Sequence, residues 1–436
     1  MTKDNPLIPR AEDRRTEARD EDAKKGFWKS LGPGIVAGAA DDDPSGIATY
    51  SIAGAQFGTA FLWTALLTWP LMAAVQTMCA RVGMVTGQGL MSALRERFPR
   101  KILVVAAAAL FIANTINIGA DLSGMADAAE MLTGLSSHLY VILFAILIGW
   151  ATIRVPYLVI ANVLKWLALV LAAYIVTAFT ISPSWPAVLS STFTIKIPGT
   201  TDGWATIVAI LGTTISPYLF FWQSSSEVEE EKSMGRRRVL DRQGASKFEI
   251  KRRKVDVGIG TFASNLAMYF IILTTALTLH ASGITHVDTS RQVAEALRPL
   301  AGRFAALLYT VGIIGTGALA SPTLSGSAAY ALAEVFDWRQ GMGEKLSEAP
   351  AFYLVVAVSL GVAVLLDYTN FNAVAALYWT AVINGLLAPF LLVGILVVAS
   401  DRNIMRGQPS SLLGRAVVGL TAAAMFGAAF GLFYFR

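Results

Sequence analysis

Three consecutive aspartates, Asp41, Asp42 and Asp43, lie inside a long apolar stretch of the chain and are followed directly by Pro44. A carboxylate in an apolar segment is unfavourable unless it is paired or bound to a cation. Proline removes a backbone donor and clashes with the preceding turn, so a helix is expected to break here. The pattern predicts a cation site with Asp43 as its principal ligand, and Asp41 and Asp42 are expected to line a water-filled vestibule.

Pro217 marks a second break of the same kind, five predicted spans further along the chain. Irregular backbone inside a membrane is tolerated only where it is buried in protein or lines a cavity. Matching breaks in the first helix of each of two five-helix halves indicate a transporter built from inverted repeats, with its site between the breaks.

The residues around the two breaks offer oxygen atoms to a cation. Ala40 and Thr213 precede the breaks, and their carbonyls are expected to be freed for ligation, directly or through water. Ser216 and Tyr218 would line the site with hydroxyls, and Gly46 would leave room for coordinated water. A divalent ion needs at least one fixed negative charge here to offset its lost hydration, and Asp43 supplies it.

The breaks lie in a chain of 436 residues that is 55% hydrophobic and only 15% charged. This surplus of apolar residues must face lipid, because the core of a soluble domain does not require it. Eleven runs are each long enough to cross a hydrocarbon core of roughly 30 Å as a helix. The sequence therefore predicts an all-α polytopic membrane protein with spans at 29–57, 60–84, 102–130, 137–153, 156–182, 203–226, 256–281, 303–334, 350–367, 371–399 and 412–434.

The formal net charge of +5 comes from Lys and Arg in short loops between the apolar runs, which indicates membrane topology and not a nucleic-acid surface. These cations lie mainly in alternate loops, which predicts a plasma-membrane protein with a cytoplasmic N-terminus and an external C-terminus. The charged segment Glu227 to Lys254 is interpreted as a solvated cytoplasmic loop. The expected partners are the lipid bilayer and the ion.

The predicted organisation has five parts. A cytoplasmic N-terminal tail precedes a first five-helix repeat, an outer loop, a second five-helix repeat and an eleventh transmembrane helix. These parts cover residues 1–28, 29–182, 183–202, 203–399 and 400–436.

At the two breaks the sequence resembles the NRAMP family of divalent metal transporters. Members carry Asp-Pro-Gly-Asn in the first helix and Met-Pro-His in the sixth, matched here by residues 43–46 and 216–218. The similarity extends to 80–87 and to 120–122, where Asp121 has a family counterpart expected to widen the negative field of the path. The resemblance implies a leucine-transporter-type 5+5 inverted repeat with discontinuous first and sixth helices plus an eleventh helix.

Two departures from the family motifs concern the choice of metal. Ser216 stands where the family has a methionine, whose soft thioether favours transition metals, and an oxygen-only site suits a hard cation. Gly46 stands where the family has an asparagine, which removes a ligand and opens space. Magnesium sheds water reluctantly and is commonly held by one or two carboxylates with several waters retained.

Three further departures concern protons. Tyr218 replaces the sixth-helix histidine, Gly124 replaces an acid expected three residues after Asp121, and 351–366 contains no arginine. With an unperturbed pKa of about 10, tyrosine is a poor proton relay at neutral pH. Together these substitutions, and the segment 213–231, resemble the NRAMP-related magnesium transporters. That branch implies transport of Mg²⁺, and also Mn²⁺, without proton coupling and without a cofactor.

Three alternatives stay open at this point. A proton-coupled Mn²⁺ or Fe²⁺ carrier of the same family is disfavoured mainly by Ser216. An amino-acid carrier of the same architecture would bind a carboxylate at the first break, where the three acids oppose an anion. An intramembrane aspartyl protease could pair Asp43 with Asp121, but no accompanying protease motif is present and no enzyme activity is expected.

Overall fold

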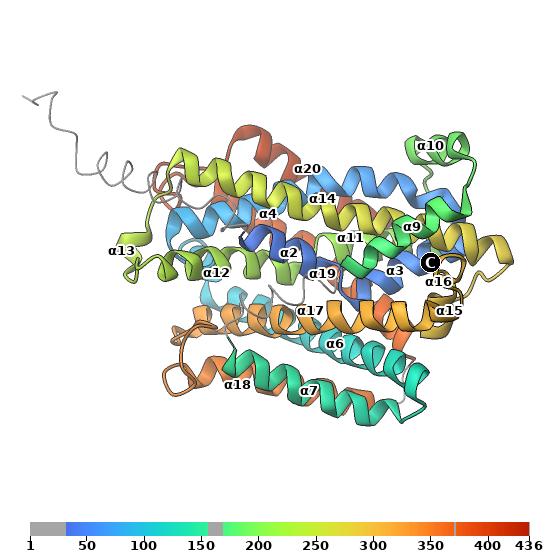
Figure 1. Cartoon of the computed structure of the whole chain (residues 1–436). Helices are drawn as coiled ribbons and strands as arrows, with labels where there is room; N and C mark the ends of the chain where they lie inside the picture. The colour runs from blue at the N-terminus through green and yellow to red at the C-terminus, as the bar shows by residue number, and fades with distance from the viewer. Residues whose placement is uncertain (1–31, 156–168, 370–371, 436) are drawn as a thin grey trace, which may run out of the picture.

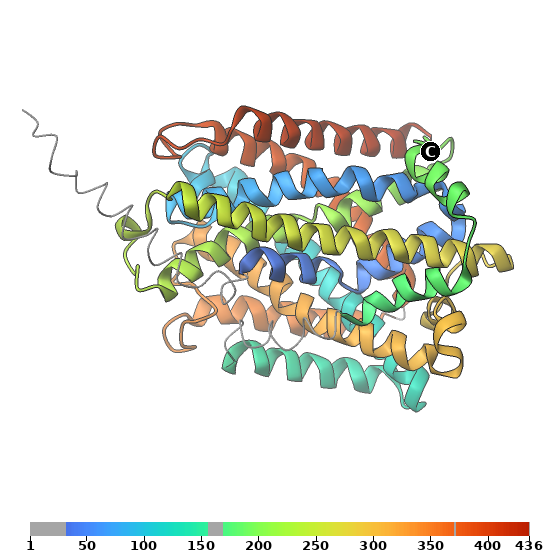
Figure 2. The ribbon, with the colours of Figure 1, turned by 45° about the horizontal axis from the view of Figure 1, so that its top comes forward.

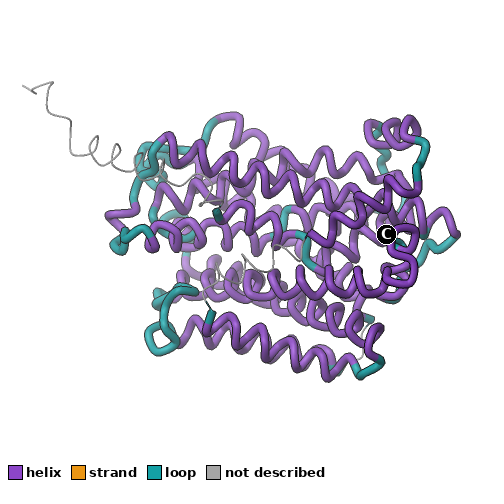
Figure 3. Tube along the Cα trace, viewed as in Figure 1, coloured by secondary structure: helices purple, strands orange, loops and turns teal. Residues whose placement is uncertain are grey.

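The computed structural model describes residues 32–155, 169–369 and 372–435, and all regular structure within these ranges is helical (Figure 3). The predicted tail at 1–28, residues 29–31 of the first predicted span and residues 156–168 of the span predicted at 156–182 lie outside the described residues.

The long helices follow the order of the predicted spans. They are α2 (Pro33–Asp41) with α3 (Pro44–Phe57), α4 (Leu62–Thr86), α6 (Arg100–Thr133), α7 (Ser137–Arg154), α9 (Ala172–Ile181), α11 (Thr201–Thr214) with α12 (Pro217–Ser233), α14 (Lys247–Thr278), α17 (Ala305–Phe336), α18 (Pro350–Asp367), α19 (Ala373–Ser400) and α20 (Leu412–Tyr434). The shorter elements are η1 (Gly58–Phe61), α5 (Leu90–Arg95), η2 (Leu169–Leu171), α10 (Trp185–Phe193), α13 (Val239–Arg242), η3 (His280–Ser282), α15 (Ser290–Glu295), α16 (Arg298–Ala301) and η4 (Gly302–Phe304).

The helices form one bundle, with α13 at one end and α10, α15 and α16 at the other (Figure 1). Among the described residues, nine stretches are long and apolar enough to cross a membrane. Two of these stretches join neighbouring elements, Pro44–Thr86 and Thr201–Ser233, and α9 is a shorter apolar helix. The predicted loop at 183–202 contains the helix α10.

The first and sixth spans are interrupted at the predicted prolines. α2 ends at Asp41 and α3 begins at Pro44, while α11 ends at Thr214 and α12 begins at Pro217. Proline starts a helix readily because the first turn needs no donor from it, whereas inside a helix it removes one hydrogen bond and clashes with the preceding turn. Pro70, Pro322 and Pro389 nevertheless lie inside the continuous helices α4, α17 and α19. The expected pair of discontinuous helices is confirmed.

Glycines allow α14 to lie directly against the first span (Figure 2). A Cβ added at Gly38 of α2 would lie 2.4 Å from the backbone carbon and oxygen of Gly260 in α14. A Cβ added at Gly260 would lie 2.3 Å from the carbonyl oxygen of Gly34. The two backbones therefore touch without intervening side chains, which holds α2 close to α14.

A bulky side chain at this contact should destabilise the fold. We expect Gly260→Leu to cost about 1–3 kcal/mol, because the helices cannot stay in contact around the added atoms. Thermal unfolding of the purified protein in detergent measures the effect. Gly258→Leu is the matched control, since a Cβ at Gly258 in the same helix meets nothing within 4 Å. Equal melting temperatures for the two variants would contradict the close approach.

A buried arginine in α14 ties α2 and α12 together. The Arg253 guanidinium donates from Nε to Glu227 at 2.7 Å and from Nη1 to Asp256 at 2.5 Å, and it also pairs with Glu230. Asp256 in turn accepts the backbone amides of Gly32 and Gly34 at 3.0 and 2.9 Å. The segment Glu227 to Lys254, predicted as a solvated loop, therefore contains the buried Glu227 and Arg253 and includes the end of α12, α13 and the start of α14.

Candidate metal site between the broken helices

Asp43 lies at the first break as the N-terminal cap of α3. Its Oδ1 accepts the Gly46 amide at 2.8 Å and the Ser45 hydroxyl at 2.6 Å. Its backbone is extended, with φ −69° and ψ 171°, as capping residues require. The predicted principal ligand is therefore held rigidly at a helix N-terminus, where the helix dipole stabilises its negative charge.

α6 brings two more polar side chains to Asp43. Asn117 Nδ2 lies 3.1 Å from Asp43 Oδ2 and 3.5 Å from Asp121 Oδ2. Asn117 and Asp121 are both fully buried and stand one turn apart on the same helix. The structure thus places the predicted Asp121 beside Asp43, with Asn117 between them.

Asn117 contacts both carboxylates of the site but was not predicted from the sequence. The sequence feature that could have identified it is the spacing of Asn117 and Asp121. An amide and a carboxylate four residues apart in an apolar helix lie on the same helix face.

The second break faces the first. Tyr218 of α12 donates its hydroxyl to the Ala40 carbonyl at 2.9 Å. A Cβ added at Gly46 would lie 3.1 Å from Thr213 Oγ1 and 3.4 Å from the Asp41 carbonyl oxygen, so the start of α3 packs against the end of α11 and the space expected for water beside Gly46 is filled by neighbouring atoms. Ser216 Oγ donates to the Thr213 carbonyl at 2.9 Å. All seven predicted site positions therefore fall in one connected cluster between the breaks.

The carbonyls expected to be free are engaged within the protein. Ala40 accepts from Tyr218, and Thr213 accepts from Ser216. The physical reason is that buried backbone acceptors rarely stay unpaired, so nearby hydroxyls cap both broken ends. A carbonyl oxygen has a second lone pair, and ligation by either one stays a prediction.

Asp41 and Asp42 are buried and not at an open vestibule, being 0% and 6% exposed. Ser264 of α14 lies 2.6 Å from Asp41 Oδ2 and 3.1 Å from Asp42 Oδ1. The close contact between α2 and α14 places both carboxylates against that helix.

Several buried carboxylates lie together in this cluster without a basic side chain paired to them. In the described ranges, no Lys or Arg forms an ion pair with any of the buried aspartates Asp41, Asp42, Asp43 and Asp121. Buried carboxylates without a counter-charge favour a bound cation. The described residues contain no group of three His, Cys, Asp or Glu side chains placed to hold a metal. A cation here would complete its shell with amide, hydroxyl or carbonyl oxygens and water.

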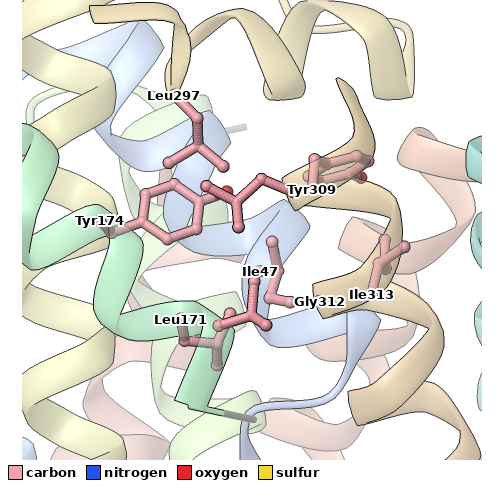
Figure 4. A pocket seen from close by; sticks show the side chains of 9 residues that line it. Ile47, Leu171, Tyr174, Leu297, Tyr309, Gly312 and Ile313 are labelled. Atoms are coloured by element: carbon pink, nitrogen blue, oxygen red, sulfur yellow. The ribbon is translucent and has the colours of Figure 1, made fainter. Parts of the chain in front are cut away.

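A mainly apolar pocket adjoins the cluster at Ile47, the residue after Gly46. Its lining includes Ile47, Leu171, Leu297 and Ile313 and the rings of Tyr174 and Tyr309 (Figure 4). Because its lining offers few polar atoms, it does not provide a second ion site.

Two interrupted helices facing each other in a bundle of apolar helices define a transporter of the leucine-transporter type. The family model "Natural resistance-associated macrophage protein-like" matches residues 34–434. The chain belongs to the Nramp family, and it is a multi-pass membrane protein that carries divalent metal cations.

Curated relatives agree with this assignment. The chain is 25% identical over 411 residues to the divalent metal cation transporter MntH of Aeromonas hydrophila, covering 91% of this chain and 94% of that one. It is 27% identical over 318 residues to MntH of Erwinia tasmaniensis, covering 70% and 72%. These relatives are transporters and not enzymes.

Solved structures share the fold at low sequence identity. The Eremococcus coleocola manganese transporter, solved with an aromatic bis-isothiourea substituted compound, has a TM-score of 0.73 at 17% identity, over 93% of this chain and 89% of that chain. MhsT, solved in complex with L-phenylalanine, has a TM-score of 0.59 at 15% identity, over 92% of this chain and 99% of that chain. The predicted leucine-transporter-type fold is thus confirmed.

Proposed function

We propose that this Nramp-family protein carries Mg²⁺, with Mn²⁺ as a second substrate, and that transport is not coupled to protons. The observation that supports this most directly is that the Asn117 amide contacts both Asp43 and Asp121. The hydroxyl-bearing Ser216 and Tyr218 lie at the facing break. Two carboxylates with neutral oxygens and retained water suit Mg²⁺. The site binds the ion as substrate, and the seven predicted residues, with Asp43 as the principal ligand, form part of it.

The second-break residues support a hard cation. Ser216 offers a hydroxyl where the family motif has a thioether, and thioethers favour softer metals. Tyr218 is hydrogen-bonded to Ala40, and its hydroxyl titrates far above neutral pH in its unperturbed state. This position therefore offers no group suited to shuttling protons.

Membrane placement forms part of the same proposal. The Lys and Arg bias of the loops supports a plasma-membrane protein with its N-terminus in the cytoplasm and its C-terminus outside. The five-helix halves at 29–182 and 203–399 would then be inverted relative to each other, with the ion site near the midplane.

Metal uptake without proton entry is the expected result in proteoliposomes. Mn²⁺ should enter down its own gradient while a pH-sensitive dye inside the vesicles reports no matching acidification. A proton ionophore added at the end checks that the dye responds. Acidification that rises in step with metal uptake would show proton coupling and overturn this part of the proposal.

Competition separates this proposal from the proton-coupled Mn²⁺ or Fe²⁺ carrier. Excess Mg²⁺ should suppress Mn²⁺ uptake if both ions use the site at Asp43. A carrier selective for transition metals would take up Mn²⁺ almost unchanged in the presence of excess Mg²⁺.

A further inference from the structure

Asn117 occupies the position between the two site carboxylates with its amide nitrogen. Nδ2 lies 3.1 Å from Asp43 Oδ2 and 3.5 Å from Asp121 Oδ2, so one NH₂ group bridges side chains of α3 and α6. In the part of the chain that the structure describes, the buried Asn117 Oδ1 and Asp121 Oδ1 have no hydrogen-bond partner. The cluster therefore contains unsatisfied oxygen acceptors beside two carboxylates.

An unsatisfied buried acceptor costs about 1–3 kcal/mol. Asn114 Oδ1 also has no partner among the described residues, and Asn117 differs from it because its amide contacts two carboxylates. The side-chain amide rotates in a broad, roughly two-fold torsional well. Half a turn exchanges Nδ2 and Oδ1, so the oxygen would face the two carboxylates. A divalent ion bound between Asp43 and Asp121 would take the place of the NH₂ group and would attract that oxygen.

We propose that Asn117 is a direct ligand of the transported ion and that its amide turns to present Oδ1 when the ion binds. This inference rests on the proposed function, because it assumes a divalent ion between Asp43 and Asp121. In this role Asn117 supplies from α6 an amide oxygen, a ligand type that Gly46 cannot supply from α3. The ion then has ligands from two helices, and the metal selectivity of the site depends on the residue at position 117.

A soft ligand at this position tests the proposal. Cysteine prefers Cd²⁺ over Mg²⁺, so Asn117→Cys should raise the ratio of Cd²⁺ to Mg²⁺ affinity by about tenfold or more over the unmodified protein. Isothermal titration calorimetry on the full chain in detergent measures both affinities. Cys79 is buried in α4 and is present in every variant, so its contribution is constant.

Asn114→Cys is the matched control. Asn114 is a buried asparagine on the same helix, and its Nδ2 donates to the Leu324 carbonyl and to Ser327 Oγ, both at 2.9 Å. A cysteine there should leave the affinity ratio unchanged. A folded Asn117→Cys protein with the ratio of the unmodified protein would overturn the assignment, because a residue that only positions Asp43 cannot change ligand softness.

A second variant, Asn117→Asp, tests the assignment of Asn117 as a ligand even if the cysteine variant does not fold. Asn117→Asp keeps an oxygen at the site and adds charge, so it should bind the divalent ion at least as tightly as the unmodified protein. Loss of binding in folded Asn117→Asp would overturn the proposal. If the unmodified protein binds Mn²⁺ but not Mg²⁺, the proposed substrate is wrong, and the Cd²⁺ to Mn²⁺ ratio then tests Asn117 independently.

Discussion

Asp43→Ala is expected to lower Mg²⁺ and Mn²⁺ uptake into proteoliposomes by about 100-fold or more, to the level of empty vesicles. The variant removes the carboxylate that meets Asn117 and the cap of α3 together. Asp43→Asn separates the two roles, because asparagine caps a helix about as well as aspartate but carries no charge. We expect Asp43→Asn to fold normally and still transport no metal.

Asp367→Asn is the control for loss of a partly buried carboxylate elsewhere. Asp367 ends α18 and is bound by Ser123 at 2.8 Å and His138 at 2.5 Å, outside the cluster at the breaks. This variant should keep most of the uptake. Transport by Asp43→Ala at the rate of the unmodified protein would exclude Asp43 as the principal ligand.

Ser216→Met should move the preference from Mg²⁺ toward Mn²⁺ and Cd²⁺ by about tenfold. A thioether at the second break adds a soft ligand, which these metals accept and Mg²⁺ does not. The change also removes the hydroxyl that caps the Gly212 and Thr213 carbonyls at 2.6 and 2.9 Å, at a cost of about 1 kcal/mol in stability. Uptake of each metal alone and in competition measures the shift.

Ser216→Ala separates the added sulfur from the lost cap. This variant loses the same hydrogen bonds and the hydroxyl without gaining sulfur, so any change in its metal preference measures the lost hydroxyl alone, and the further change in Ser216→Met measures the thioether. If the methionine and alanine variants show the same ratio of Mn²⁺ to Mg²⁺ uptake, a thioether at position 216 does not set the selectivity.

The broken helices could be predicted from Pro44 and Pro217 together with the acids at the first break and the matching positions of the two breaks in the two halves. Proline alone is not sufficient, because Pro70, Pro322 and Pro389 lie inside continuous helices. Pro44 and Pro217 start α3 and α12, the first and sixth spans break there, and Asp43 caps α3. The order of the apolar runs also predicted the order of the long helices. These features depend on neighbouring residues and on the length needed to cross a bilayer.

Other parts of the site depend on contacts between distant segments and were missed. The distance from Asn117 to Asp43 is set by how α6 packs beside the break, over 74 residues of sequence. The burial of Asp41 and Asp42 follows from the glycine contact of α2 with α14 and from Ser264. Pairing of the Ala40 carbonyl requires Tyr218, which reaches it only in the folded bundle.

The most direct test of the proposed function is Mg²⁺ influx into proteoliposomes that contain the purified protein and a magnesium-sensitive dye. The proposed function predicts dye response that saturates with external Mg²⁺, is inhibited by Mn²⁺ and is absent with Asp43→Asn. Vesicles that take up Mn²⁺ but admit no more Mg²⁺ than empty vesicles would contradict it.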